Sequence, residues 1–74
     1  MYTGNYECLE LFVKPEAGKK GSVSLKKIKE NKTEIKELQH IYGNWIKFQT
    51  DKDTEYEITA QDCTITFAYL SECE

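Results

Sequence analysis

The chain has 74 residues, of which 39% are apolar and 31% are charged. This length accommodates one small domain, residues 1–74, and the apolar content excludes intrinsic disorder as the default state. All 10 cations are lysines, against 13 acidic residues. Lysine lacks the planar guanidinium that reads guanine edges, which argues against sequence-specific DNA recognition.

Charge is distributed unevenly along the chain. The net charge is −2 over residues 1–13, +5 over residues 14–47 and −6 over residues 48–74. An asymmetry of this kind predicts electrostatic steering toward a partner, without naming the partner.

The cysteines Cys8, Cys63 and Cys73 are an odd set without C-x-x-C spacing. A secreted disulfide scaffold has an even set, and a zinc site needs about four closely spaced ligands. We therefore expect reduced thiols, no metal and a cytoplasmic location. Residues 1–5 lack the features of a signal peptide, and no apolar run approaches the roughly 18 residues of a membrane span, so no membrane association is expected.

Alternating apolar residues predict strands near both ends of the chain. Residues 5–14 place Leu9, Leu11 and Val13 on one face, and the strand ends at Pro15 because proline cannot donate to a ladder. Residues 63–70 alternate in the same way. Their predicted apolar face consists of Cys63, Ile65, Phe67 and Tyr69.

Residues 45–50 and 54–59 predict a β-hairpin closed by the three-residue loop 51–53. In this register Phe48 faces Tyr56 and Ile46 faces Ile58. Both apolar pairs share one face, which supports the pairing.

Residues 22–42 allow two interpretations. Residues 22–29 and 34–41 can pair as a hairpin, with Ile28 opposite Ile35 and Leu25 opposite Leu38, and Gly43-Asn44 can then close a second hairpin. Alternatively, residues 32–42 form a helix whose apolar face carries Leu38. The hairpin also pairs lysines with glutamates, so we predict it and keep the helix as the alternative.

The predicted fold is mainly β, a small antiparallel five- or six-stranded meander that curls into a partial barrel. The alternative is an α+β fold of the order β-α-β-β-β, with the helix near residues 32–42.

No convergent set of catalytic groups is visible, since His40 is the single histidine and no nucleophile motif surrounds any cysteine or serine. We therefore expect a non-enzyme without cofactors. The first functional hypothesis is a protein-binding module, an inhibitor or accessory protein of the kind that phages and mobile elements carry. An exposed aromatic would anchor it and acidic residues would steer it. The predicted protein-binding residues are Tyr42, Asp51, Asp53, Glu55 and Glu57.

The alternative hypothesis is single-stranded nucleic-acid binding through the lysine-rich stretch 19–36. Lysines that track phosphates and aromatics that stack on bases are the components of such a surface. The residues predicted to bind nucleic acid are Lys26, Lys27, Lys29 and Trp45. A homo-oligomer is a third prediction, because apolar residues on both faces of the sheet could be covered by a second copy.

Overall fold

A computed structural model describes residues 1–73 and contains six antiparallel strands in two three-stranded sheets, with no helix among these residues. The prediction of a small, mainly β, antiparallel domain is therefore confirmed. The strands are β1 (Cys8–Pro15), β2 (Ser22–Lys27), β3 (Lys32–Glu37), β4 (Asn44–Gln49), β5 (Tyr56–Gln61) and β6 (Cys63–Ser71). Since residues 32–37 form β3, the alternative helix over residues 32–42 is wrong.

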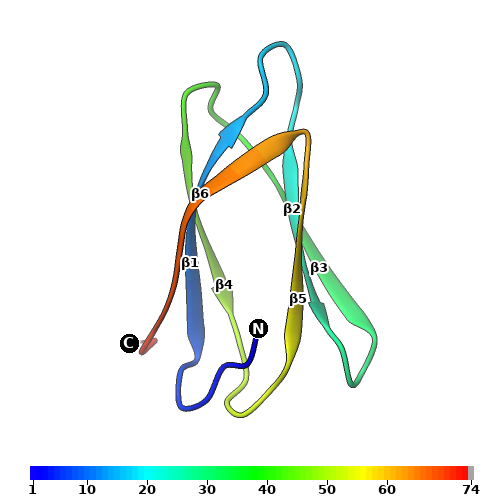
Figure 1. The fold of residues 1–74 in the computed structure, drawn as a ribbon, viewed down its shortest axis with the longest axis vertical. Coiled ribbons are helices and arrows are strands. Elements are labelled where there is room, and N and C mark those ends of the chain that lie inside the picture. The colour runs from blue at the N-terminus through cyan, green and yellow to red at the C-terminus, as the bar shows by residue number, and fades with distance from the viewer. Residues whose placement is uncertain (74) are drawn as a thin grey trace.

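The strand order is β4-β1-β6 in the first sheet and β3-β2-β5 in the second (Figure 1). The first sheet supplies Leu9, Leu11, Val13 and Phe48 to the core, all at most 1% exposed. Val23 and Leu25 meet them from the second sheet. Alternate residues of β1 point inward as predicted, because successive side chains of a strand project to opposite faces.

β2 and β3 form the expected hairpin, but the predicted register is wrong. Leu25 lies opposite Glu34 rather than Leu38, and Ser24 lies opposite Ile35. The turn closes early because Asn31 adopts a left-handed conformation (φ 53°), which asparagine tolerates better than most residues. Leu38 thereby lies at the open end of the hairpin, where its N–H donates to the Gly21 carbonyl at 2.9 Å, and its side chain is a buried core residue.

The predicted hairpin between residues 45–50 and 54–59 is also wrong, because β4 and β5 belong to different sheets. Phe48 lies opposite Leu9 on β1, whereas Tyr56 lies opposite Lys27 on β2. The alternation of apolar residues indicates which face of a strand is buried but not which strand lies beside it. Phe48 can therefore pair with an apolar residue of β1 as well as with one of β5. The intervening loop is held by Thr3, whose hydroxyl donates to the Asp51 carbonyl at 2.6 Å.

Gly43 and Asn44 do not close a second hairpin, and residues 38–43 form a loop instead. The buried Asn44 amide organises this loop. Its oxygen accepts hydrogen bonds from the backbone N–H groups of Gln39 and His40, and its nitrogen donates to the His40 carbonyl, at 2.8–2.9 Å. The Asn44 side chain, predicted to lie in a hairpin turn, therefore satisfies backbone groups of a loop that leads from one sheet to the other.

A β-bulge in β6 divides the apolar face predicted for residues 63–70. Val13 pairs with Ile65 and Phe12 pairs with Phe67, which leaves Thr66 as the extra residue. Ile65 consequently packs against the core, whereas Phe67 and Tyr69 project from the outer face. The expectation that all four side chains share one face is wrong, because a bulge changes the phase of the alternation.

Cys8 and Cys73 are joined in a disulfide, so the expectation of three reduced thiols is wrong. The antiparallel pairing of β1 with β6 places Cys8 opposite Ser71, two residues before Cys73. A sequence separation of 65 residues conceals this proximity. Cys63 is the remaining free thiol, and burial raises the pKa of that thiol.

Candidate interaction surface

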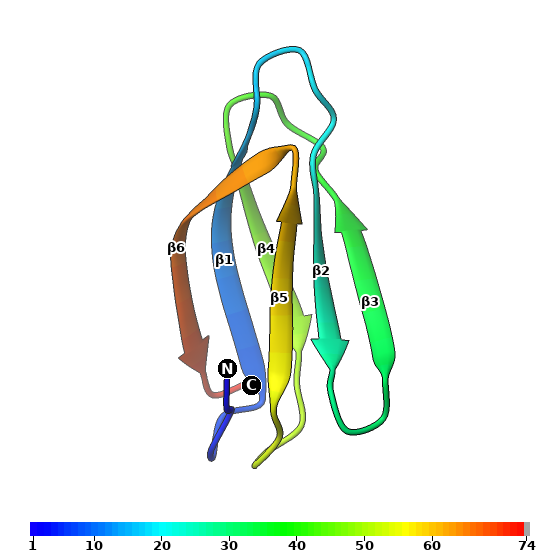
Figure 2. The ribbon, with the colours of Figure 1, turned by 45° about the vertical axis from the view of Figure 1, so that its right-hand side comes forward.

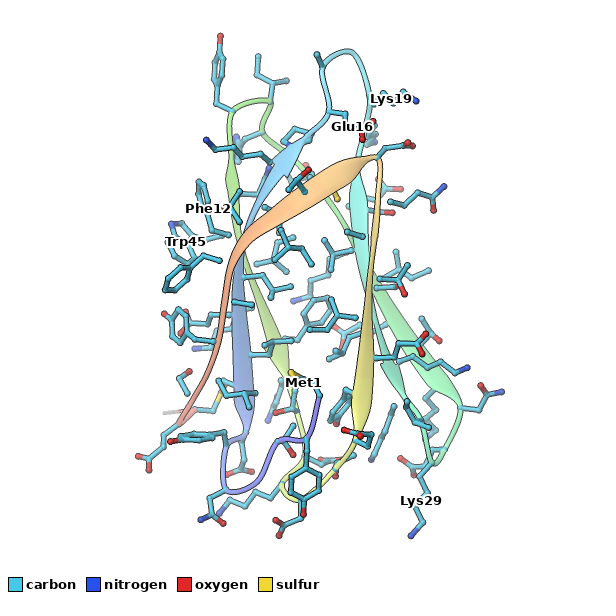
Figure 3. The ribbon with its side chains drawn as sticks, in the orientation of Figure 1. Met1, Phe12, Glu16, Lys19, Lys29 and Trp45 are labelled. Carbon is cyan, nitrogen blue, oxygen red and sulfur yellow. A yellow bond between two sulfur atoms is a disulfide. The ribbon has the colours of Figure 1, made fainter. Side chains whose placement is uncertain are left out.

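Four aromatic side chains form a row on the outer face of the first sheet, which we call the aromatic strip: Phe12, Trp45, Phe67 and Tyr69. Successive ring centroids are 5.0 Å apart for Phe12–Trp45, 6.4 Å for Trp45–Phe67 and 5.5 Å for Phe67–Tyr69. Figure 3 shows Phe12 and Trp45 projecting away from the second sheet. Trp45 is 64% exposed, Phe67 55% and Tyr69 40%, which leaves a contiguous apolar surface open to solvent.

Strand register positions the strip. Phe12 lies on the central strand β1, with Trp45 opposite on β4 and Phe67 opposite on β6. The three side chains share one face because directly paired residues of an antiparallel sheet point the same way. Gly43 leaves room for the Phe12 ring, since a Cβ atom on Gly43 would lie only 2.5 Å from the ring's Cζ.

A carboxylate lies beside the strip. Glu10 follows on the same face of β1, opposite Tyr69 on β6 and Lys47 on β4. The Ser71 hydroxyl donates to Glu10 Oε2 at 3.3 Å. A hydrogen bond with Glu10 also raises the pKa of the Tyr69 phenol above its ordinary value, so Tyr69 stays a neutral donor. The strip therefore combines apolar rings with the Glu10 carboxylate and, opposite it on β4, the Lys47 ammonium.

The predicted protein-binding residues do not form one surface. Tyr42, which is 85% exposed, lies in the β3–β4 loop at one end of a molecule 37 Å long. Asp51 and Asp53 lie in the β4–β5 loop at the opposite end (Figure 1). An interface that uses Tyr42 and these acids together would have to span the long axis of the domain.

The four predicted acidic residues also have partners or cationic neighbours within the chain. Asp51 pairs with the Lys27 ammonium, and Asp53 accepts a hydrogen bond from the Tyr2 phenol at 3.1 Å. Glu55 lies 3.3 Å from the N-terminal ammonium, and Glu57 lies opposite Lys26. These contacts reduce the negative field that the sequence segment alone suggests.

The predicted nucleic-acid-binding residues are separated in the same way. Lys27 pairs with Glu30 as well as Asp51, and these two carboxylates raise the pKa of its ammonium. Lys29 lies in the β2–β3 turn, far from Trp45 on the outer face of the other sheet (Figure 3). The fold thus places no predicted lysine of residues 26–29 beside the predicted stacking residue.

A cleft of about 640 Å³ opens at the end of the molecule that carries Tyr42. It lies between residues 15–21 and residues 38–42, and its lining includes His40, Lys19 and Glu16. No serine, threonine or cysteine lines it, so His40 has no hydroxyl or thiol of those residues to activate there.

Within residues 1–73, no three His, Cys, Asp or Glu side chains gather in an arrangement that could hold a metal ion. None of these residues belongs to a helix with the length and apolar character needed to cross a bilayer. Neither a protein-family model, nor a curated protein, nor a solved structure matches the chain.

Sequence reasoning missed Phe12, Phe67 and Tyr69 as surface residues. A signal existed for Phe12, which shares the outward face of its strand with Glu10, where a solvated strand normally carries a polar residue. Phe67 and Tyr69 gave no such signal, because only the bulge at Thr66 turns them outward.

Proposed function

We propose that this protein is a non-catalytic protein-binding module that docks through the aromatic strip. The supporting observation is that four rings, each in contact with the next, lie on one sheet face, with three of them 40–64% exposed. Trp and Tyr are the residues that most often dominate binding energy at protein interfaces, and a contiguous exposed apolar surface is typical of such a site. An inhibitor or accessory role for a phage or mobile element remains part of this proposal.

A protein partner suits the strip better than a nucleic acid. The rings pack at interplanar angles of 55–75°, so they cover part of one another's faces instead of forming open platforms. Nucleic-acid binding uses free ring faces along a cationic groove. Here the charged groups beside the rings are the Glu10 carboxylate and, opposite it on β4, the Lys47 ammonium, so the rings lie next to a mixed pair of charges and not along a cationic groove.

The partner is expected to present apolar side chains with a basic or hydroxyl group placed for Glu10. In the original hypothesis the acidic residues of 51–57 steer association. Because each already has a partner or a cationic neighbour, we expect the quadruple neutralisation of Asp51, Asp53, Glu55 and Glu57 to change the association rate modestly. Trp45→Ala is expected to change the dissociation rate much more.

A displayed library of random peptides tests the proposal. Peptides selected on the native protein should lose binding to Trp45→Ala and Phe67→Ala. They should keep binding to Ile35→Ala, which removes an equally exposed apolar side chain (65%) from the other sheet. Selected peptides that bind both strip variants at full affinity would contradict the proposal.

A mixed-sequence single-stranded oligonucleotide tests the nucleic-acid alternative, with Trp45 fluorescence as the readout at low and high salt. The protein-binding proposal predicts no change at micromolar oligonucleotide. Quenching that weakens steeply with salt would favour nucleic-acid binding instead.

The proposed cytoplasmic location also needs a direct test, because disulfides persist mainly in oxidising compartments. Thiol alkylation in intact cells, followed by mass spectrometry, counts the free cysteines. One alkylated thiol would support an oxidising location with the Cys8–Cys73 disulfide formed, and three would support the cytoplasm with the disulfide open.

A further inference from the structure

The two sheets expose four strand edges, and three of them are protected. β3 carries Lys32, Glu34, Lys36 and Glu37, and charged side chains discourage edge-to-edge pairing. On β4, the Lys47 carbonyl accepts a hydrogen bond from the Lys36 ammonium. At the start of β5, the Tyr56 N–H donates to the Met1 carbonyl at 2.7 Å, so the N-terminal segment covers the start of that edge, and Glu57 adds a charge next to it.

The edge of β6 carries neither charges nor a covering segment, and the bulge at Thr66 is the irregularity it shows. Its nine residues, CTITFAYLS, include no charged residue and no proline. Within the described part of the chain, no hydrogen bond outside the strand ladders uses a backbone group of residues 64–71. Figure 2 shows β6 at the outside of its sheet with no strand beyond it. A row of free N–H and C=O groups on an uncharged strand is a template for another strand.

We propose that two copies of this chain pair antiparallel through their β6 edges, with the twofold axis at Ala68. A twofold rotation maps an antiparallel pair of identical strands onto itself. One such contact therefore closes into a dimer and does not propagate. Ala68 faces the same side as the buried Leu11, its partner on β1, but Ala68 itself is exposed. It offers a small residue at the axis, where two copies come closest.

This register also creates favourable contacts on the outer face of the sheet. It places Phe67 of each copy opposite Tyr69 of the other, and aromatic cross-strand pairs stabilise antiparallel sheets. Residues 65–71 of the two copies pair with one another and include no charged residue, so no like charges meet within this stretch. The two aromatic strips then join into one surface across a six-stranded sheet. The dimer depends on the strand edge and stands independently of any docking partner for the strip.

The interface should be weak. One strand edge with two partly exposed rings is smaller than the roughly 800 Å² per partner of stable complexes. We therefore expect a concentration-dependent monomer–dimer equilibrium between micromolar and millimolar protein, measured by sedimentation equilibrium.

Cysteine cross-linking tests the register. In a Cys63→Ser background, Ala68→Cys should form a reducible covalent dimer under mild oxidation, because two copies of residue 68 face each other across the axis. Ala60→Cys in the same background is the matched control, since Ala60 is also an exposed alanine on an edge strand, β5. It should stay largely monomeric. Equal cross-linking of the two variants would overturn the proposed register.

A charge variant tests the dimer without oxidation. Ala68→Glu brings two carboxylates together at the axis and should abolish the concentration-dependent dimer, whereas Ala60→Glu should leave it unchanged. Unfolding curves of both variants establish that each is folded. A wild-type protein that stays monomeric at millimolar concentration, or a dimer that survives Ala68→Glu, would overturn the proposal.

Discussion

The two sheets each contribute three strands around one core, but the side chains on their outer faces differ. The β3-β2-β5 sheet and its loops are surrounded by ion pairs, such as Lys20–Glu37 at 3.1 Å and Lys27 with Glu30 and Asp51. The β4-β1-β6 sheet carries the aromatic strip on its outer face. One face is thus mainly charged, with Ile35 as an exposed apolar side chain, whereas the other exposes a contiguous row of rings that binding would bury. We therefore expect binding on the side of the β4-β1-β6 sheet.

Truncating one ring inside and one ring outside the first sheet gives the largest expected contrast. Phe48→Ala removes a fully buried ring and should cost about 3–5 kcal/mol of unfolding free energy. Phe67→Ala, on the outer face, should cost about 1 kcal/mol, mainly through its lost ring contacts. Urea unfolding measures both, with trimethylamine N-oxide added so that the weaker variant folds. Comparable losses would mean that the strip belongs to the core.

The disulfide ties the start of the central strand β1 to the segment that follows the edge strand β6, and its removal ranks next. Cys73→Ser opens a connection between residues 65 positions apart and should lower the free energy of unfolding by about 2–4 kcal/mol. Cys63→Ser is the control, because it keeps a donor for the Ser22 carbonyl and opens no covalent link. If reducing agent destabilises wild type and Cys73→Ser equally, the Cys8–Cys73 disulfide is not what stabilises the sheet.

The Gly43→Ala variant tests the packing of the aromatic strip without changing any of its four rings. The added methyl group would displace the Phe12 ring, at a cost of about 1–3 kcal/mol, and should shift the Trp45 emission because the two rings are in contact. Gly18→Ala also strains the backbone, since Gly18 has a φ of 75°, but it meets no neighbouring atom and should leave Trp45 emission unchanged. An unaltered Trp45 spectrum in Gly43→Ala would show that the strip adjusts without disturbance.

The smallest expected effect is on how the stability of the domain depends on pH, through an ion pair at the β3-β2-β5 sheet. Lys27 holds the pKa of the Glu30 carboxyl below its ordinary value of 4.5. Because the folded pKa is lowered, this stabilisation is present above about pH 4.5 and is lost as the pH falls through the folded pKa. Lys27→Met should therefore reduce the acid-range slope of stability slightly, since surface pairs contribute little. A Lys27→Met variant with an unchanged slope between pH 6 and pH 3, measured by thermal unfolding in overlapping buffers, would assign the acid sensitivity to other carboxylates.

The sequence could predict strands wherever side-chain alternation was uninterrupted. The inward set Leu9, Leu11 and Val13 was correct because alternation depends only on local backbone geometry. Partner strands were not predictable in the same way. Phe48 finds an apolar neighbour on β1 as readily as it would on β5, and nothing local distinguishes the two.

The candidate site was less predictable than the fold. Trp45 was recognised as an exposed aromatic but was grouped with lysines that belong to the other sheet. The acidic residues were read as a free patch, whereas folding places the Lys27 ammonium beside Asp51 and Lys26 opposite Glu57. Charges that are separated along the chain can be neighbours in space, so a linear charge profile overstates the field of the folded domain.

Length and alternation by themselves determined that this is one small domain with strands near both ends of the chain, because domain size follows from length and a strand follows from the period of two. They left residues 32–42 open between strand and helix. Only the tertiary structure decided which strands are neighbours, that Cys8 meets Cys73, and that Thr66 turns Phe67 and Tyr69 outward. Each of these depends on contacts between residues far apart in sequence, and the free energy of such a contact is set by competing pairings across the whole chain.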